Sequence, residues 1–90
     1  MSLAPNQFGR YPCPCCHYHT FQEPATGEYI ICPVCFWEDD PVQAVEPTFV
    51  SGANQVSLRQ AQVNFVALGV SDPTFKRQVR LPTTEELPDQ

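Results

Sequence analysis

The sequence has few basic residues, no long apolar run and no phosphate-binding loop, and each absence excludes a class of function. Five Lys and Arg against ten Asp and Glu leave a net charge of −5, which disfavours direct binding to nucleic acid. No apolar run reaches the length of about 18 residues that a transmembrane helix needs, so we expect no membrane span. Because no Gly-rich phosphate loop or serine–histidine arrangement accompanies the acidic residues, we expect a protein that is not an enzyme.

The N-terminal residues, MSLAPNQFGRYPC, also lack the charged start and apolar stretch of a secretory signal. We therefore expect a cytoplasmic protein. In that compartment disulfides are rare and cysteines more often bind metal, and the odd number of cysteines, five, agrees with this interpretation.

The chain has 90 residues and a mass of 10.1 kDa, enough for one modest domain. A chain of this size buries only a little over about 60% of its unfolded surface, so a packed core alone gives marginal stability. We therefore expect a further stabilising element, for which the cysteines are the obvious candidates. Ten prolines exclude a long helical bundle. We expect an N-terminal tail at residues 1–10, a single domain at 11–82 and an acidic C-terminal tail at 83–90, with both tails poorly ordered.

Local patterns predict a small α+β fold. The β-prone segments 19–23 and 28–31 flank the turn-like residues 24–27, which predicts a β-hairpin. A firm amphipathic helix is predicted between the N-cap Ser57, with Gln60 completing a capping box, and the C-terminal Gly69. A short second helix is predicted from Pro73 to a point before Pro82. The segment 38–54 is predicted to be loop.

Two CPxC units carry the chemistry of the sequence. Their separation, 15 residues from the end of one unit to the start of the other, is typical of a zinc site. The hairpin between the units would bring the two pairs of sulfurs together into a zinc ribbon, with four thiolates in a tetrahedron around one ion. The predicted ligands of this site are Cys13, Cys16, Cys32 and Cys35.

Four thiolates leave no coordination position for water, which indicates a structural rather than a catalytic metal. We expect one zinc ion per chain; iron suits four thiolates as well. With four thiolates and one Zn²⁺, the net charge falls from −5 to about −7.

Three further residues, one inside the first unit and two just after it, are alternative ligands or reactive groups. Cys15 is either a small packed side chain or a reactive thiol whose pKa the metal lowers. His17 and His19 are either surface histidines or replacements for one cysteine at the metal. A thiol-redox protein centred on the CPCC motif is a further alternative, but neither unit is followed by the long helix that such proteins place there.

An aromatic and acidic run follows the second unit. It is either a recognition surface or a segment whose aromatic residues pack inward while its acids face solvent. The candidate interaction surface comprises Trp37, Glu38, Asp39 and Asp40.

Several segments together resemble the cysteine-rich CPCC family of small bacterial proteins. They are YPCPCC at 11–16, ICPVCFWEDD at 31–40, GANQVSLRQAQVNF at 52–65 and GVSDPTF at 69–75. The resemblance covers about residues 11–82 and implies a bacterial protein, zinc-ribbon-containing, from a family with no established activity. The matching positions are the five cysteines and the run 36–40, whereas His17 stands where the family usually has glycine.

These features predict a non-catalytic, zinc-stabilised protein-interaction module. Its acidity predicts a basic protein partner, and makes nucleic acid a less favoured one. The alternatives are a nucleic-acid-binding zinc ribbon and a protein with thiol chemistry at Cys15.

Overall fold

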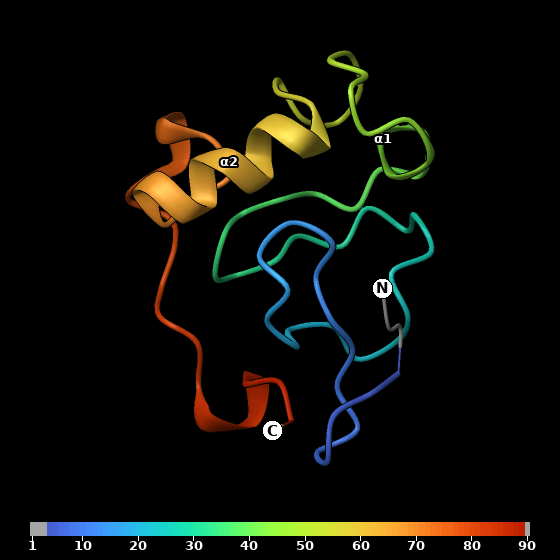
Figure 1. The fold of residues 1–90 in the computed structure, drawn as a ribbon, viewed down its shortest axis with the longest axis vertical. Coiled ribbons are helices and arrows are strands. Elements are labelled where there is room, and N and C mark those ends of the chain that lie inside the picture. Colours follow the sequence, from blue (N-terminus) through green and yellow to red (C-terminus); the bar gives the residue numbers. More distant parts are fainter. Residues whose placement is uncertain (1–3, 90) are drawn as a thin grey trace.

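A computed structural model describes residues 4–89, most of which form turns and loops (Figure 1). Two α-helices are present in this part of the chain, α1 (Pro41–Val45) and α2 (Leu58–Leu68). Two short 3₁₀ turns follow, η1 (Pro73–Phe75) and η2 (Thr84–Glu86). In Figure 1, α2 lies over the loops of residues 11–40, and η2 lies at the opposite end of the molecule. Neither helix within residues 4–89 has the length and apolar character needed to cross a bilayer.

The predicted zinc-ribbon hairpin, and with it the α+β fold class, is wrong. Residues 4–89 contain no β-strand and no sheet, only two isolated antiparallel bridges. One bridge joins Tyr11 to Phe21 and the other joins Ile31 to Glu38. Segment 19–23 therefore pairs with a residue that precedes the first cysteine unit, and segment 28–31 pairs with a residue that follows the second unit. The two segments do not pair with each other.

Local backbone geometry explains this difference. Each CPxC turn folds the chain back on itself, so the nearest antiparallel neighbour of each β-prone segment is the stretch across that turn. Tyr29 has a φ of 62°, which interrupts the extended run that a hairpin strand would need. Gly27, at φ 88°, approaches Pro41 so closely that a Cβ at residue 27 would lie 2.5 Å from the proline Cβ. The loop between the units is thus fixed against the start of α1.

Helix α2 confirms the one firm helix that the sequence predicted. The Ser57 hydroxyl accepts a hydrogen bond from the Gln60 backbone N–H at 3.0 Å. The Gln60 side chain does not complete the capping box; it donates to Asn64 Oδ1 at 2.8 Å. Gly69 ends the helix in the left-handed conformation, at φ 78°.

Helix α1 lies in the segment that the sequence predicted to be loop. Asp40 caps it by accepting hydrogen bonds from the backbone N–H groups of Val42 and Gln43, and Pro41 occupies the first turn. This is a good helix start, but five residues are too few for an apolar periodicity to appear in the sequence.

The predicted second helix is reduced to the single turn η1. The Asp72 carboxylate accepts from the Thr74 N–H at 2.9 Å, so the predicted start is present. Beyond Phe75 the chain continues only as a turn, in which the Gln78 N–H donates to the Phe75 carbonyl at 2.9 Å; the Phe75 ring packs on Phe36 with the centroids 4.8 Å apart. That contact anchors the turn beside the second cysteine unit.

The hydrophobic core is built around the cysteines. Leu58 and Ala61 project into it from α2, and the Phe65 ring meets Tyr18 edge-on at a centroid distance of 6.1 Å. Leu68 is half-exposed and stays outside the buried core. The buried cluster consists of Cys13, Cys15, Cys16, Phe21, Cys32, Val34, Cys35, Trp37, Leu58 and Ala61.

The two terminal segments hydrogen-bond to each other, although the sequence predicts that both are poorly ordered. The buried Asn6 side chain donates to the carbonyls of Glu85 and Leu87 at 2.8 and 3.0 Å. Glu86 is buried and forms a two-pronged ion pair with Arg80, with both N···O distances at 2.8 Å. Residues 6–10 and 83–89 are thereby held on the body of the protein.

Candidate metal centre

The first CPxC unit forms a tight turn whose backbone closes on itself. The Cys13 carbonyl accepts from the His17 N–H at 2.9 Å, and the Cys13 N–H donates to the Tyr18 carbonyl at 2.9 Å. His17 has a φ of 68°, in the left-handed region where glycine is favoured. This turn places the side chains of Cys13 and Cys16 on the same side of the backbone.

The second unit repeats this geometry. The Cys32 carbonyl accepts from the Phe36 N–H at 2.7 Å, and the Cys32 N–H donates to the Trp37 carbonyl at 2.9 Å. Phe36 has the same φ, 68°, as its counterpart in the first unit. Two turns of equal shape therefore face each other, and each contributes two sulfurs.

The four predicted ligand sulfurs are brought together in the core. All lie within 4.8 Å of one another, and all four cysteines are buried. The Sγ atoms of Cys13 and Cys35 are 3.6 Å apart, and those of Cys16 and Cys32 are 3.7 Å apart. A tetrahedral ion with metal–sulfur bonds of about 2.3 Å requires sulfurs about 3.8 Å apart. The cluster is thus positioned to hold one metal ion.

The charge of the cluster also favours a cation. Burial raises the pKa of the Cys13 thiol well above its ordinary value. The pKa of Cys32 is lowered, because the Cys13 thiol first of all, and then Cys16, Cys35 and Thr20, donate hydrogen bonds that stabilise its thiolate. Without a metal, neighbouring thiolates repel one another; a divalent cation removes that obstacle and allows all four to ionise.

Two hydrogen-bond donors to the sulfurs come from outside the ligand set. The Thr20 hydroxyl donates to Cys32 Sγ at 3.1 Å, and the Cys15 backbone N–H lies 3.4 Å from Cys13 Sγ. Such donors reduce the negative charge on a ligating sulfur and orient it. The role of Thr20 could not be predicted from the sequence, because nothing in the local pattern distinguishes it from any other residue of a β-prone segment.

The three alternative residues lie outside the sulfur cluster. Cys15 is buried, at 2% exposure; its backbone N–H approaches Cys13 and its thiol interacts with Cys35, but its sulfur is not one of the four in the cluster. His17 is exposed, and His19 is buried with its Nδ1 2.8 Å from the carbonyl oxygen of Arg10. Within the described residues, the four cysteines are the one group of three or more His, Cys, Asp or Glu side chains close enough to share an ion.

Three of the four residues of the candidate interaction surface, 37–40, are buried, and Glu38 is half-buried. Trp37 and Asp39 are each 1% exposed, and Asp40 is 5% exposed. Asp40 holds the loop at Ala53 as well as capping α1, accepting from the Ala53 N–H at 3.0 Å. Two of the three acids do not face solvent, because the carboxylates of Asp39 and Asp40 accept from backbone N–H groups inside the fold, whereas Glu38 is half-buried.

A buried amide network, also missed in the sequence, supports this segment. Asn54 accepts from the Glu38 N–H at 2.9 Å and donates to the Glu38 carbonyl at 2.8 Å. Gln43, fully buried, receives a hydrogen bond from the Asn54 side chain at 2.9 Å and donates to the Val56 carbonyl at 2.9 Å. The network ties α1 to the loop that leads into α2.

The fold and the site together define a class of small protein whose core is a buried four-thiol cluster carried on two opposed turns. Within that class, the chain belongs to the family described as "Cysteine-rich CPCC", whose model matches residues 11–86. A comparison with curated proteins finds no match.

Proposed function

We propose that the four cysteines hold one zinc ion with a structural role. The observation that carries this proposal is the proximity of four buried sulfurs, all within 4.8 Å of one another and 3.6 and 3.7 Å apart in two pairs. A closed shell of four thiolates has no position for a substrate or a reacting water. Because the cluster forms the centre of a small core, the binding free energy of the ion becomes folding free energy.

Metal analysis combined with mass spectrometry tests the zinc assignment. The intact mass of the bacterially expressed protein, native and then acid-denatured, should show one zinc per chain that is lost on denaturation, when five free thiols appear. A folded, metal-free protein with two disulfides would contradict the structural-metal assignment. One iron per chain in place of zinc would contradict the identity of the metal alone.

We further propose that the folded chain is a non-catalytic interaction module for a basic protein. The support is electrostatic: the net charge of −5 becomes about −7 with a zinc tetrathiolate. The same charge disfavours the nucleic-acid alternative. Thiol chemistry at Cys15 is disfavoured by the burial of that side chain, since reactive thiols are partly exposed.

Selection from an unbiased displayed peptide library tests the interaction role. Peptides retained by the zinc-loaded protein should be enriched in Lys and Arg, and their retention should weaken as salt rises, because exposed charges are screened. Enrichment of acidic or uncharged peptides, or retention that salt does not change, would contradict a basic partner.

A further inference from the structure

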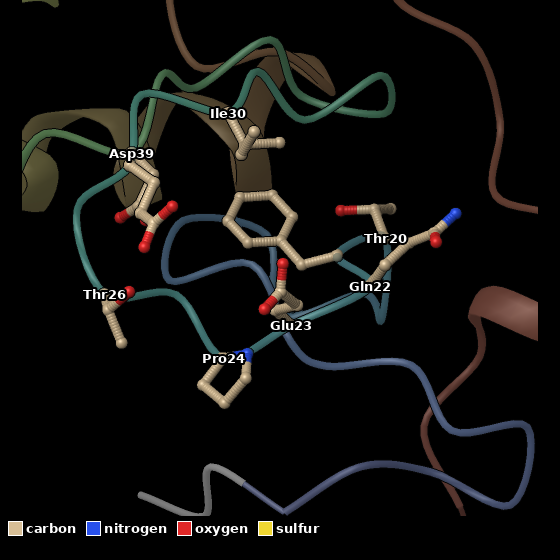
Figure 2. A pocket seen from close by; sticks show the side chains of 9 residues that line it. Thr20, Gln22, Glu23, Pro24, Thr26, Ile30 and Asp39 are labelled. Carbon is tan, nitrogen blue, oxygen red and sulfur yellow. The ribbon is translucent and has the colours of Figure 1, made fainter.

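A pocket of about 430 Å³ opens beside the metal-binding turns, between the segment 20–30 and residue 39. Figure 2 shows Thr20, Gln22 and Glu23 on one side of it, with Thr26 and Asp39 on the other. Its volume lies within the range of about 300–1,000 Å³ typical of ligand sites. None of its lining residues is a cysteine, but Thr20 in its lining donates to Cys32 Sγ, so the pocket adjoins the sulfur cluster without including it.

The lining of the pocket is acidic. Glu23, Glu28 and Asp39 contribute carboxyl groups, and no basic residue lines it. Neither of the ion pairs found among the described residues includes any of these three acids. Their negative charge is therefore available to a cationic ligand.

Asp39 provides a second, independent indication of a ligand. It is 1% exposed, and its Oδ2 accepts from the Gly27 N–H at 2.7 Å. Its Oδ1 has no hydrogen-bond partner within residues 4–89. Buried acceptors are nearly always paired, so an unpaired carboxylate oxygen in a pocket wall marks a position where a donor is missing. Trp37 Nε1 is also buried without a partner, but Trp37 does not line the pocket.

The arrangement of the carboxylates does not suit a metal ion. In the described part of the chain, the four cysteines are the one set of potential ligands within mutual reach. Acids spread around a pocket, with the side chains of Phe21 and Ile30 also in its lining, suit an extended organic cation with an apolar stem.

Among such cations, the arginine side chain fits these walls best. Its planar guanidinium carries five N–H donors in a fixed fork, enough to reach more than one carboxylate at once. A lysine ammonium is a compact point charge and lacks this fork.

The surroundings of the pocket indicate that the cation belongs to a protein. Tyr29 and Ile30 are each 54% exposed and Ile31 is 43% exposed, so these residues form an exposed apolar strip that meets the pocket at Ile30. Aromatic and apolar residues around a charged recognition point are typical of protein–protein interfaces. A free amino acid would leave this strip uncovered.

We propose that this pocket binds an arginine side chain of the basic partner protein, with Glu23, Glu28 and Asp39 as its acceptors. The proposal rests on the proposed interaction function and specifies where on the molecule that function resides. Asp39 Oδ1 receives a guanidinium N–H, and the strip at residues 29–31 contacts the partner chain around the arginine.

The test is a ¹H–¹⁵N NMR titration of the zinc-loaded full chain with N-acetyl-L-arginine methylamide. We expect millimolar binding, with the largest shifts at the backbone amides of Gly27 and the residues that line the pocket. Glu23→Gln and Glu28→Gln should each weaken binding about fivefold, because each removes one charge-assisted acceptor. Both glutamates are exposed, so the fold should tolerate these changes.

Three controls make the result decisive. Glu46→Gln removes the same charge from an exposed glutamate that does not line the pocket, and should leave binding unchanged. The neutral citrulline counterpart of the probe should cause no shifts, and the lysine counterpart should bind more weakly. The proposal is overturned by absent shifts at the lining residues, by equal binding of citrulline, by tighter binding of lysine, or by an equal effect of Glu46→Gln. If basic library peptides bind all the same, the proposed interaction function stands and this site for it does not.

Discussion

At the scale of single residues, the site separates the five cysteines into four ligands and one core side chain. Cys15 and Cys16 are adjacent and both buried, yet only Cys16 has its sulfur in the cluster. A substitution of the Cys15 side chain leaves in place its backbone N–H, which lies 3.4 Å from Cys13 Sγ, and removes a thiol that interacts with Cys35.

This difference predicts opposite outcomes for two neighbouring substitutions. Cys16→Ser should abolish stoichiometric zinc binding, and with it much of the free energy of about 10–16 kcal/mol that structural zinc contributes in small domains. Cys15→Ser should keep one zinc per chain and cost about 1 kcal/mol of folding stability. Metal analysis and thermal unfolding of the two variants measure both effects. Loss of zinc in Cys15→Ser would contradict the ligand assignment.

His17 carries a backbone cost that can be measured. Its φ of 68° is in the left-handed region, where a non-glycine residue loses about 1–2 kcal/mol. Its side chain is exposed and lies outside the sulfur cluster. We predict that His17→Gly stabilises the zinc-loaded protein by about 0.5–1 kcal/mol in urea denaturation, while His17→Ala changes stability by less than about 0.5 kcal/mol. Reduced zinc affinity in both variants would instead identify His17 as a ligand.

At the scale of elements, the features that could be predicted from the sequence are those fixed by interactions between residues close together in the chain. Helix α2 follows from its own caps: Ser57 is a good N-cap and Gly69 adopts the left-handed conformation cheaply. The four ligands could likewise be predicted, because the CPxC turn is a local structure. The hairpin could not, because the partner of each β-prone segment depends on how the turns fold the chain back.

The burial of the acids at residues 39–40 could not be predicted from the neighbouring sequence either. An acidic run is usually solvated, and the sequence does not show that backbone N–H groups from residues 27 and 53 reach these carboxylates. The role of Thr20 at the sulfur of Cys32 depends on the same kind of tertiary placement.

Asp40 connects two elements, and this predicts a large effect of its removal. Its carboxylate caps α1 and also accepts from the Ala53 N–H, so Asp40→Ala should destabilise the protein by about 2 kcal/mol in urea denaturation at neutral pH. The exposed Glu46→Ala, at the other end of the same helix, is the control and should cost less than about 0.5 kcal/mol. Equal effects of the two substitutions would contradict this role of Asp40.

The stabilisation by Asp40 should depend on pH in a defined direction. The hydrogen bond from the Ala53 backbone N–H, ahead of those from Gln43 and Val42, lowers the pKa of Asp40 in the folded protein. A lowered pKa means that the stabilisation is complete above the ordinary aspartate pKa and is lost as pH falls through the folded value. The stability difference between wild type and Asp40→Asn should therefore shrink below about pH 4.

At the scale of the whole molecule, the chain closes on itself through its two ends. Glu86 is 3% exposed, pairs with Arg80 and accepts from the Thr83 N–H, while its carbonyl accepts from the His19 N–H at 2.6 Å. The pKa of Glu86 is lowered, first of all by its hydrogen bond with Arg80. The acidic C-terminal segment therefore contributes to the folded structure around the first cysteine turn.

This closure predicts unequal effects of two adjacent substitutions. Glu86→Gln should cost about 1–2 kcal/mol, reduced from the value for a fully buried pair because the Arg80 side chain is 46% exposed. Glu85→Gln, which removes a more exposed ion pair with Arg10, should cost less than about 0.5 kcal/mol. Urea denaturation of the two variants at the same pH compares them directly; a ranking in the opposite order would contradict the closure.

The central claim is that four thiolates and one zinc ion hold this chain in its fold. The most direct test is a ¹H–¹⁵N NMR titration of the reduced, metal-free chain with zinc. We predict a poorly dispersed spectrum without metal, converted to a single dispersed spectrum that is complete at one equivalent. A dispersed, folded spectrum before any zinc is added, or a transition that ends at a stoichiometry other than one, would contradict the account.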